Sequence, residues 1–287
     1  MKSILLALAA VSLLVSMKTD KPAYFLFDSK GKKASYNDLI DQASNVDVVL
    51  FGELHNNPIC HWLQLELTSD LYKLRKDKLV LGAEMFEADD QAVLDEYLNG
   101  MIKESNFKKE VKLWPNYETD YRPLVELARE NKLPFVATNV PRRYAALVNT
   151  SGFEGLEKIS AEQQKYIAPA GFPYDPELPG YKKMLQTDQG MQHRSGNLPK
   201  AQALKDATMA YFIAKHAGEG KLFLHFNGSY HSDNHEGLVW YLKHYGHSLK
   251  VLTIASVEMA DISQLPEDSL GLGDFILLVP ESMTKTY

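Results

Sequence analysis

Four polar side chains of the sequence follow short apolar runs that end in glycine. They are Glu53, His55, Glu84 and His231. Glycine lets the backbone turn sharply and lets a ligand approach it closely. Ligands of open parallel sheets bind beyond the carboxyl ends of the strands, so we expect these side chains to share one polar site. The alternative interpretation is that they cap helices and form internal salt bridges.

Two chemistries suit this set. Glu53, His55, Glu84 and His231 could bind a divalent metal ion that activates water. Alternatively, His55 or His231 could act as a general base that Glu53 or Glu84 holds in place. Either arrangement would serve the hydrolysis of an ester, an amide or a lactone.

Two arginines, Arg142 and Arg143, follow another predicted strand at 135–139. A guanidinium pairs bidentately with a carboxylate or a phosphate, so Arg142 or Arg143 could receive such a group from a ligand. An ion pair with Glu53 or Glu84 explains the same residues equally well.

An alternation of strands and helices is needed to position these residues. Apolar runs typical of strands covered on both faces lie at 46–51, 79–82, 134–137, 222–226, 251–254 and 275–279. Helical patterns lie at 60–76, 123–131, 201–217 and 234–245. The alternation predicts an α/β fold, with a mainly parallel central sheet flanked by helices.

The segment from about 145 to 200 interrupts this alternation. Its part between 168 and 181 is rich in proline and aromatic residues. Connections of this length are usually functional or disordered. We interpret 145–200 as a helical insertion that forms a lid, and a solvated connector is the alternative.

Length and charge limit the class of protein. The chain has 287 residues, a net charge of −6 and a pI near 5.9. The length suits one α/β domain over residues 17–287. An acidic chain without a basic face is not expected to bind nucleic acid.

The N-terminus has the pattern of an export signal. Lys2 precedes an apolar run from Ile4 to Val15. The run is shorter than the about 20 residues of a membrane span, so we expect a signal peptide at 1–16 and a location in the periplasm or at the outer-membrane surface. Met17 stands where a bacterial lipoprotein has its acylated cysteine. If Met17 replaces a native cysteine, a lipid anchor would tether the protein to a membrane.

Several of these segments together resemble the ChaN-like family of haem-binding, iron-regulated bacterial lipoproteins. The resemblance runs from about Tyr24 to Val279. It rests on the segments 51–55, 84–87, 139–143, 201–210 and 228–231. The Gly-x-x-His motifs at 52–55 and 228–231 also resemble those of a wider superfamily, which includes erythromycin esterases and Tiki-type metalloproteases. The family implies an exported haem-binding protein, and the superfamily implies hydrolase chemistry at the Glu/His cluster.

Haem requires an apolar slot, an axial ligand and cations for its propionates. The predicted lid offers aromatic, histidine and cationic side chains, of which we expect Tyr174, Tyr181, Lys183, His193 and Arg194 to contact haem. Tyr181 or His193 is the expected axial ligand. No Cys-x-x-Cys-His motif occurs in the sequence, so the haem would be bound non-covalently.

The sequence thus predicts a haem-binding exported protein in iron acquisition, with a hydrolase as the alternative. Half-covered haem leaves an apolar patch, so a homodimer could sandwich the ligand between two lids.

Overall fold

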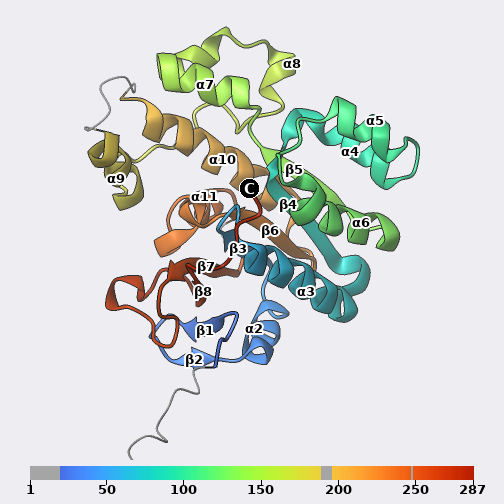
Figure 1. Ribbon diagram of the computed structural model, residues 1–287. Helices are drawn as coiled ribbons and strands as arrows, with labels where there is room; N and C mark the ends of the chain where they lie inside the picture. The colour runs from blue at the N-terminus through green and yellow to red at the C-terminus, as the bar shows by residue number, and fades with distance from the viewer. Residues whose placement is uncertain (1–19, 189–195, 247) are drawn as a thin grey trace, which may run out of the picture.

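The computed structural model describes residues 20–188, 196–246 and 248–287, and these residues form one twisted sheet with helices on both of its faces (Figure 1). The predicted signal peptide and Met17 lie outside the described residues, as do His193 and Arg194.

The sheet of the described residues has eight strands, in the order β2-β1-β8-β7-β3-β6-β4-β5. Strands β3 to β8 run parallel, whereas β1 pairs antiparallel with β8 and β2. The strands are β1 Phe25–Asp28, β2 Lys33–Ala34, β3 Val48–Glu53, β4 Leu79–Glu87, β5 Phe135–Asn139, β6 Leu222–Gly228, β7 Val251–Met259 and β8 Phe275–Pro280. The predicted mainly parallel α/β fold is confirmed. The short antiparallel edge formed by β1 and β2 was not predicted.

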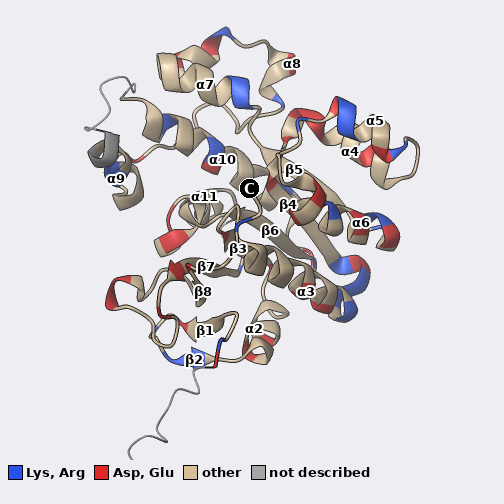
Figure 2. Cartoon of the chain, viewed as in Figure 1, with Lys and Arg blue, Asp and Glu red and all other residues tan. Residues whose placement is uncertain are grey.

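Alternation along the buried strands separates two hydrophobic layers. In β3, Val49 and Phe51 face one core, and Val48 and Leu50 face the other. The first core is covered by α2 Tyr36–Ala43, α3 Pro58–Arg75, α4 Gln91–Leu98, α5 Glu104–Glu110 and α6 Arg122–Asn131. The second is covered by α10 Leu198–His216 and α11 Leu238–Tyr245. Charged residues of both signs lie mostly on the surrounding helices and loops (Figure 2).

The prediction of a helix from residue 234 was wrong at its start. Residues 233–235 form a short 3-10 turn in which Asn234 has φ of 58°, and Gly237 has φ of 48°. These left-handed conformations are incompatible with a continuous α-helix, so α11 begins only at Leu238.

The segment between β5 and α10 is helical, with α7 Arg142–Ser151, α8 Ala161–Gln164 and α9 Pro179–Asp188. Its apolar residues pack against α10 and α11 rather than against the sheet. Val148 and Ile167 share one cluster with Leu204 of α10, and Tyr181 belongs to the core beneath α11. Among the described residues, no helix has the length and apolar character that a bilayer crossing requires.

Candidate functional site

The order of the strands explains why the polar motifs meet. Strand β6 lies between β3 and β4, so the carboxyl ends of all three are neighbours. Glu53 at the end of β3 is in register with Gly228 at the end of β6. Glu84 lies in the last part of β4, and His231 follows β6 in a short 3-10 turn. The structure therefore brings Glu53, His55, Glu84 and His231 together at one edge of the sheet.

Glu53 is the anchor of the first pair. Its side chain is buried, and its Oε1 accepts hydrogen bonds from His55 Nδ1 at 2.9 Å and from the Tyr121 hydroxyl at 2.6 Å. Its Oε2 accepts from the amide of Gln64 at 2.5 Å. These bonds fix the plane of the carboxylate and orient the His55 ring. Nδ1 of His55 is thereby engaged, which leaves Nε2 on the side of Gly228.

His231 is the centre of the second arrangement. Its Nδ1 donates to Asp206 of α10 at 2.5 Å, and its Nε2 lies 3.2 Å from Oε1 of Glu84. The other oxygen of Glu84 accepts from the backbone N–H of Gly228 at 2.9 Å. The far oxygen of Asp206 accepts from the Tyr181 hydroxyl at 2.8 Å. A buried chain of hydrogen bonds thus joins helix α9 to the strand ends.

The charged side chains in this hydrogen-bonded network shift one another's pKa values. Burial lowers the pKa of His231, but the carboxylates of Glu84 and Asp206 outweigh burial and raise it to about 10. Burial alone would raise the pKa of Glu84, yet the nearby His231 holds it well below its usual range. The His55 pKa is also raised, because the effects of Glu53 and Glu84 exceed that of burial. His231 is therefore protonated near neutral pH.

Two glycines make room for this arrangement. A Cβ on Gly228 would lie 2.7 Å from Nε2 of His55, and one on Gly52 would lie 2.9 Å from the Cα of Ser229. Only glycine lets the strand ends and the His55 ring approach so closely. The glycines at the strand ends therefore serve close packing between the two Gly-x-x-His segments.

Two clefts open at the strand ends, and His55 and His231 line both. The first has a volume of about 490 Å³; we call it the Trp114 cleft, after the indole whose centroid lies 4.8 Å from that of His55. The second has a volume of about 600 Å³ and includes Tyr230, Asp233 and Tyr287. Burial raises the pKa of Asp233 to about 7. No described residue of the insertion between 145 and 200 lines either cleft, so the described part of the insertion does not cover this site.

The structure does not support the predicted metal ion at the Glu/His cluster. Across residues 20–188, 196–246 and 248–287, no group of three or more His, Cys, Asp or Glu side chains is arranged to hold one. The reason lies in the hydrogen bonds, because both ring nitrogens of His231 already face carboxylates and Glu53 is occupied by donors.

The structure does not bring Arg143 into the cluster. Its guanidinium pairs with Asp89 at 2.5 Å and stacks 4.5 Å from the ring of Tyr144. Arg142 does line the Trp114 cleft, where it pairs with Glu87. Neither arginine pairs with Glu53 or Glu84 in the described residues.

Several supporting residues of the site carried no signal strong enough to find them in the sequence. Gln64 and Tyr121 hold Glu53, Trp114 covers His55, and Lys205 lines the Trp114 cleft from α10. Most are far from the strand-end motifs in sequence. Asp206 of α10, which accepts from His231, lies in the segment 201–210 that carries the family resemblance.

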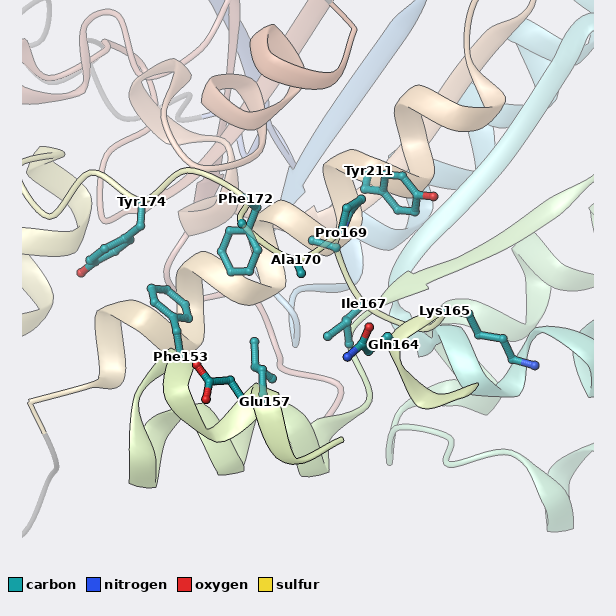
Figure 3. Close-up of a pocket in the computed structure, with 13 residues that line it drawn as sticks. Phe153, Glu157, Gln164, Lys165, Ile167, Pro169, Ala170, Phe172, Tyr174 and Tyr211 are labelled. Atoms are coloured by element: carbon teal, nitrogen blue, oxygen red, sulfur yellow. The ribbon is translucent and has the colours of Figure 1, made fainter. Parts of the chain in front are cut away.

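A separate cavity of about 700 Å³ lies within the insertion. Phe153 and Phe172 turn their rings toward each other across its interior, and Tyr211 of α10 forms part of its wall (Figure 3). Tyr174, one of the predicted haem contacts, also lines it. We call this space the insertion cavity.

The remaining predicted haem contacts lie elsewhere. Tyr181 is only 3 % exposed and donates its hydroxyl to Asp206. Burial and the Asp206 charge raise the pKa of Tyr181 far above its usual range, which disfavours an iron-binding tyrosinate. Lys183 lines a small hollow with Tyr230 and Asp233. The predictions for His193 and Arg194 concern residues that the structure does not describe.

Comparison with known proteins identifies the family. Residues 39–242 match the family described as haem-binding uptake, Tiki superfamily, ChaN. This match spans most of the chain, so the protein belongs to that family. No curated protein matches the chain.

The fold is similar to that of a solved structure described as cofacial haem binding to ChaN of Campylobacter jejuni. The two chains share 17 % identity, with a TM-score of 0.68, over 89 % of this chain and 96 % of that one. The type III effector HopBA1 and a Bacillus cereus protein are more distant. Their identities are 13 % and 11 %, and each matches with a TM-score of 0.46 over 86 % of this chain and 92 % of its own.

Proposed function

We propose that this protein is an exported haem-binding protein that serves iron acquisition, and that haem lies in the insertion cavity. The observation that carries the proposal is the cavity itself. It has about 700 Å³ and a wall of aromatic and aliphatic side chains, in a chain that belongs to a haem-binding family. Small-molecule sites typically measure about 300–1,000 Å³ and are mostly apolar.

The flat faces of haem would contact the rings of Phe153 and Phe172, whose centroids are 5.2 Å apart. Haem entry therefore requires these rings to separate or the ligand to lie along their edges. Tyr174 packs on Phe153 at 5.3 Å, so the three rings would move together. Aromatic burial of this kind contributes strongly to binding.

The axial ligand is proposed from the tyrosines of the cavity wall, Tyr174 and Tyr211, with His193 retained as a prediction. A phenolate suits ferric iron as a hard oxygen donor. Tyr181 is disfavoured in this conformation because Asp206 holds its hydroxyl. We propose that Lys165 pairs with the haem propionates. Lys165 lines the cavity, and its ion pair with Glu162 is exposed to solvent.

Haemin titration followed by the Soret band tests this assignment. Wild type should bind haemin saturably. Among Tyr174→Phe, Tyr211→Phe and His193→Ala, the variant that lacks the axial ligand should have a shifted Soret maximum and weaker binding. Tyr181→Phe should leave the Soret maximum in place. Weak, non-saturable binding by wild type would refute the proposal, and an unchanged spectrum in all three variants would refute the proposed ligands.

Export and iron acquisition belong to the same proposal and rest on the apolar run from Ile4 to Val15. Cell fractionation should find the mature protein in the periplasm or at the outer membrane. A deletion strain should grow more slowly with haemin as the iron source. Finding the protein with an intact Met1 in the cytosol would contradict export.

A homodimer is proposed for the haem-loaded state, because the related ChaN structure is described as binding haem cofacially. Light scattering after size exclusion should show a dimer with haemin. A monomer at saturating haemin would exclude cofacial binding between two copies in solution.

A hydrolase remains the second candidate function, and the Glu53–His55 pair favours it. Its hydrogen bond of 2.9 Å orients the imidazole, and His55 lines both clefts. Such a pair suits general base catalysis once the imidazole loses its proton. Activity on a panel of esters, amides and lactones, lost in His55→Ala, would establish it.

A further inference from the structure

The Trp114 cleft has features that haem binding in the insertion cavity does not use. The two spaces share no lining residue. The cleft measures about 490 Å³, which lies within the range of small-molecule sites. Its occupant should therefore be a small molecule distinct from haem.

Lys205 supplies a positive charge in this cleft that no side chain contacts directly. It makes no hydrogen bond or ion pair within the described part of the chain, although it lines the cleft and its charge lowers the pKa of Glu84. The other cations nearby are engaged, since Arg142 and Lys112 both pair with Glu87. A half-buried ammonium without a partner is suited to receive an anionic group.

Asn139 supplies an unmet acceptor. Its Nδ2 donates to the backbone oxygen of Glu84 at 2.9 Å, which fixes the amide. Its Oδ1 is buried and has no partner among the described residues. A buried acceptor without a donor is unfavourable. Asn139 lines the cleft, so a small adjustment of its surroundings would let a ligand hydroxyl or amino group donate to Oδ1.

One wall of the cleft is apolar. It consists of Leu113, Trp114 and Pro115, and the indole lies against the His55 ring. A flat ring placed on this wall would bury apolar surface and could stack on the indole. The wall thus selects a planar, aromatic ligand body.

From these three features we propose that the Trp114 cleft binds a small aromatic carboxylic acid that bears a hydroxyl or amino donor. The carboxylate pairs with Lys205, the donor bonds to Oδ1 of Asn139, and the ring lies on Trp114. This inference adds a second ligand to the protein and does not depend on the haem proposal.

Isothermal titration calorimetry with 4-hydroxybenzoate tests it. Benzoate lacks the donor and phenol lacks the carboxylate, so both should bind more weakly than 4-hydroxybenzoate, with phenol about tenfold or more weaker. Absence of saturable binding by 4-hydroxybenzoate would overturn the proposal. Equal binding of all three probes would do the same.

Two variants localise the binding. Lys205→Met should weaken 4-hydroxybenzoate binding about tenfold or more, and Lys205→Arg should retain most of it. Lys182→Met is the matched control, because Lys182 pairs with Glu177 and does not line the cleft, so this variant should leave binding unchanged. Trp114→Leu provides an independent test of the ring contact and should also weaken binding.

Haemin separates this proposal from the haem function. Lys205→Met should bind haemin as wild type does, and haemin should not displace 4-hydroxybenzoate. Displacement by haemin, or wild-type affinity of Lys205→Met for 4-hydroxybenzoate, would place the acid outside the Trp114 cleft. Loss of haemin binding with retained 4-hydroxybenzoate binding would instead refute only the haem proposal.

Discussion

The insertion cavity and the Trp114 cleft lie in the same chain but are lined by different kinds of side chain. Apolar rings such as Phe153 and Phe172 form the cavity, on segments that carry no strand. The cleft is formed mainly by polar side chains at the ends of parallel strands and the loops beside them, with Glu84 and His231 held by several hydrogen bonds. The cavity is thus suited to a large apolar ligand, and the cleft to a small polar one.

The two regions are also held differently. The register of β3, β6 and β4 fixes the cleft, so its geometry follows from the sheet. Side-chain packing against α10 and α11 fixes the cavity. Tyr181 links them, because its ring lies 5.8 Å from that of Tyr174 and its hydroxyl bonds to Asp206. Because side-chain packing holds the cavity wall and strand register holds the cleft, we expect the cavity wall to rearrange more easily than the strand ends.

The largest effect is expected when the buried charge between the two carboxylates is removed. His231→Ala leaves Glu84 and Asp206 without their partner, and breaking a buried ionic network costs about 3–5 kcal/mol of unfolding free energy. Urea unfolding measures the loss. His244→Ala, on the exposed side of α11, should change the free energy by less than about 0.5 kcal/mol. Equal effects of the two variants would contradict the view that the strand ends depend on this charge.

Alkaline pH should weaken the same region. The pKa of His231 is raised from 6.5 to about 10, so its contribution to stability is complete below pH 6.5 and is lost as the pH rises through about 10. Glu84 has a lowered pKa, so its contribution stays constant over this window and is lost only in acid. The unfolding free energy should therefore fall from pH 7 to 10, by up to about 1.4 kcal/mol per pH unit from His231 alone.

His231→Gln is the control for this pH dependence. The variant has no ionisable group at this position, so its slope between pH 7 and 10 should be smaller than that of wild type. Denaturant unfolding at several pH values measures both slopes. Identical slopes would show that His231 does not carry a shifted pKa.

A smaller effect is expected from added volume at the strand ends. Gly228→Ala places a Cβ 2.7 Å from Nε2 of His55, so the imidazole must move, at a cost of about 1–3 kcal/mol. Gly196→Ala is the matched control, because a Cβ there meets no atom within 4 Å. Thermal unfolding compares the two. If Gly228→Ala were as stable as Gly196→Ala, the close packing of the two Gly-x-x-His segments would be wrong.

The smallest effect concerns the link between the regions. Tyr181→Phe removes one of the two donors to Asp206 and should cost about 1–2 kcal/mol. Tyr230→Phe loses only an exposed hydrogen bond to Gly180 of α9 and should cost less. The His231 ring signals in NMR spectra should shift in Tyr181→Phe and stay in place in Tyr230→Phe. Unchanged signals in both variants would show that the two regions are independent.

The sequence alone predicted the elements whose signals are local. All six parallel strands were predicted from apolar runs, because a strand buried on both faces needs an unbroken run such as 48–51. The helical pattern at 201–217 corresponds to α10, which begins three residues earlier, at Leu198, because Asn197 is its N-cap residue and Pro199 occupies its first turn. The pair β1 and β2 was missed because Lys33–Ala34 is too short to carry a pattern.

Part of the candidate site could also be predicted from the sequence, and part could not. Glu53, His55, Glu84 and His231 could be selected from the sequence because each follows a run that ends in glycine. The order of the strands, which places β6 between β3 and β4, could not be read from their separate patterns, since strand order depends on long-range pairing. The tertiary structure alone decided that Arg143 pairs with Asp89 and that Tyr181 is buried against Asp206. Such partners lie tens of residues apart, and no local periodicity encodes which distant side chain will neutralise a given charge.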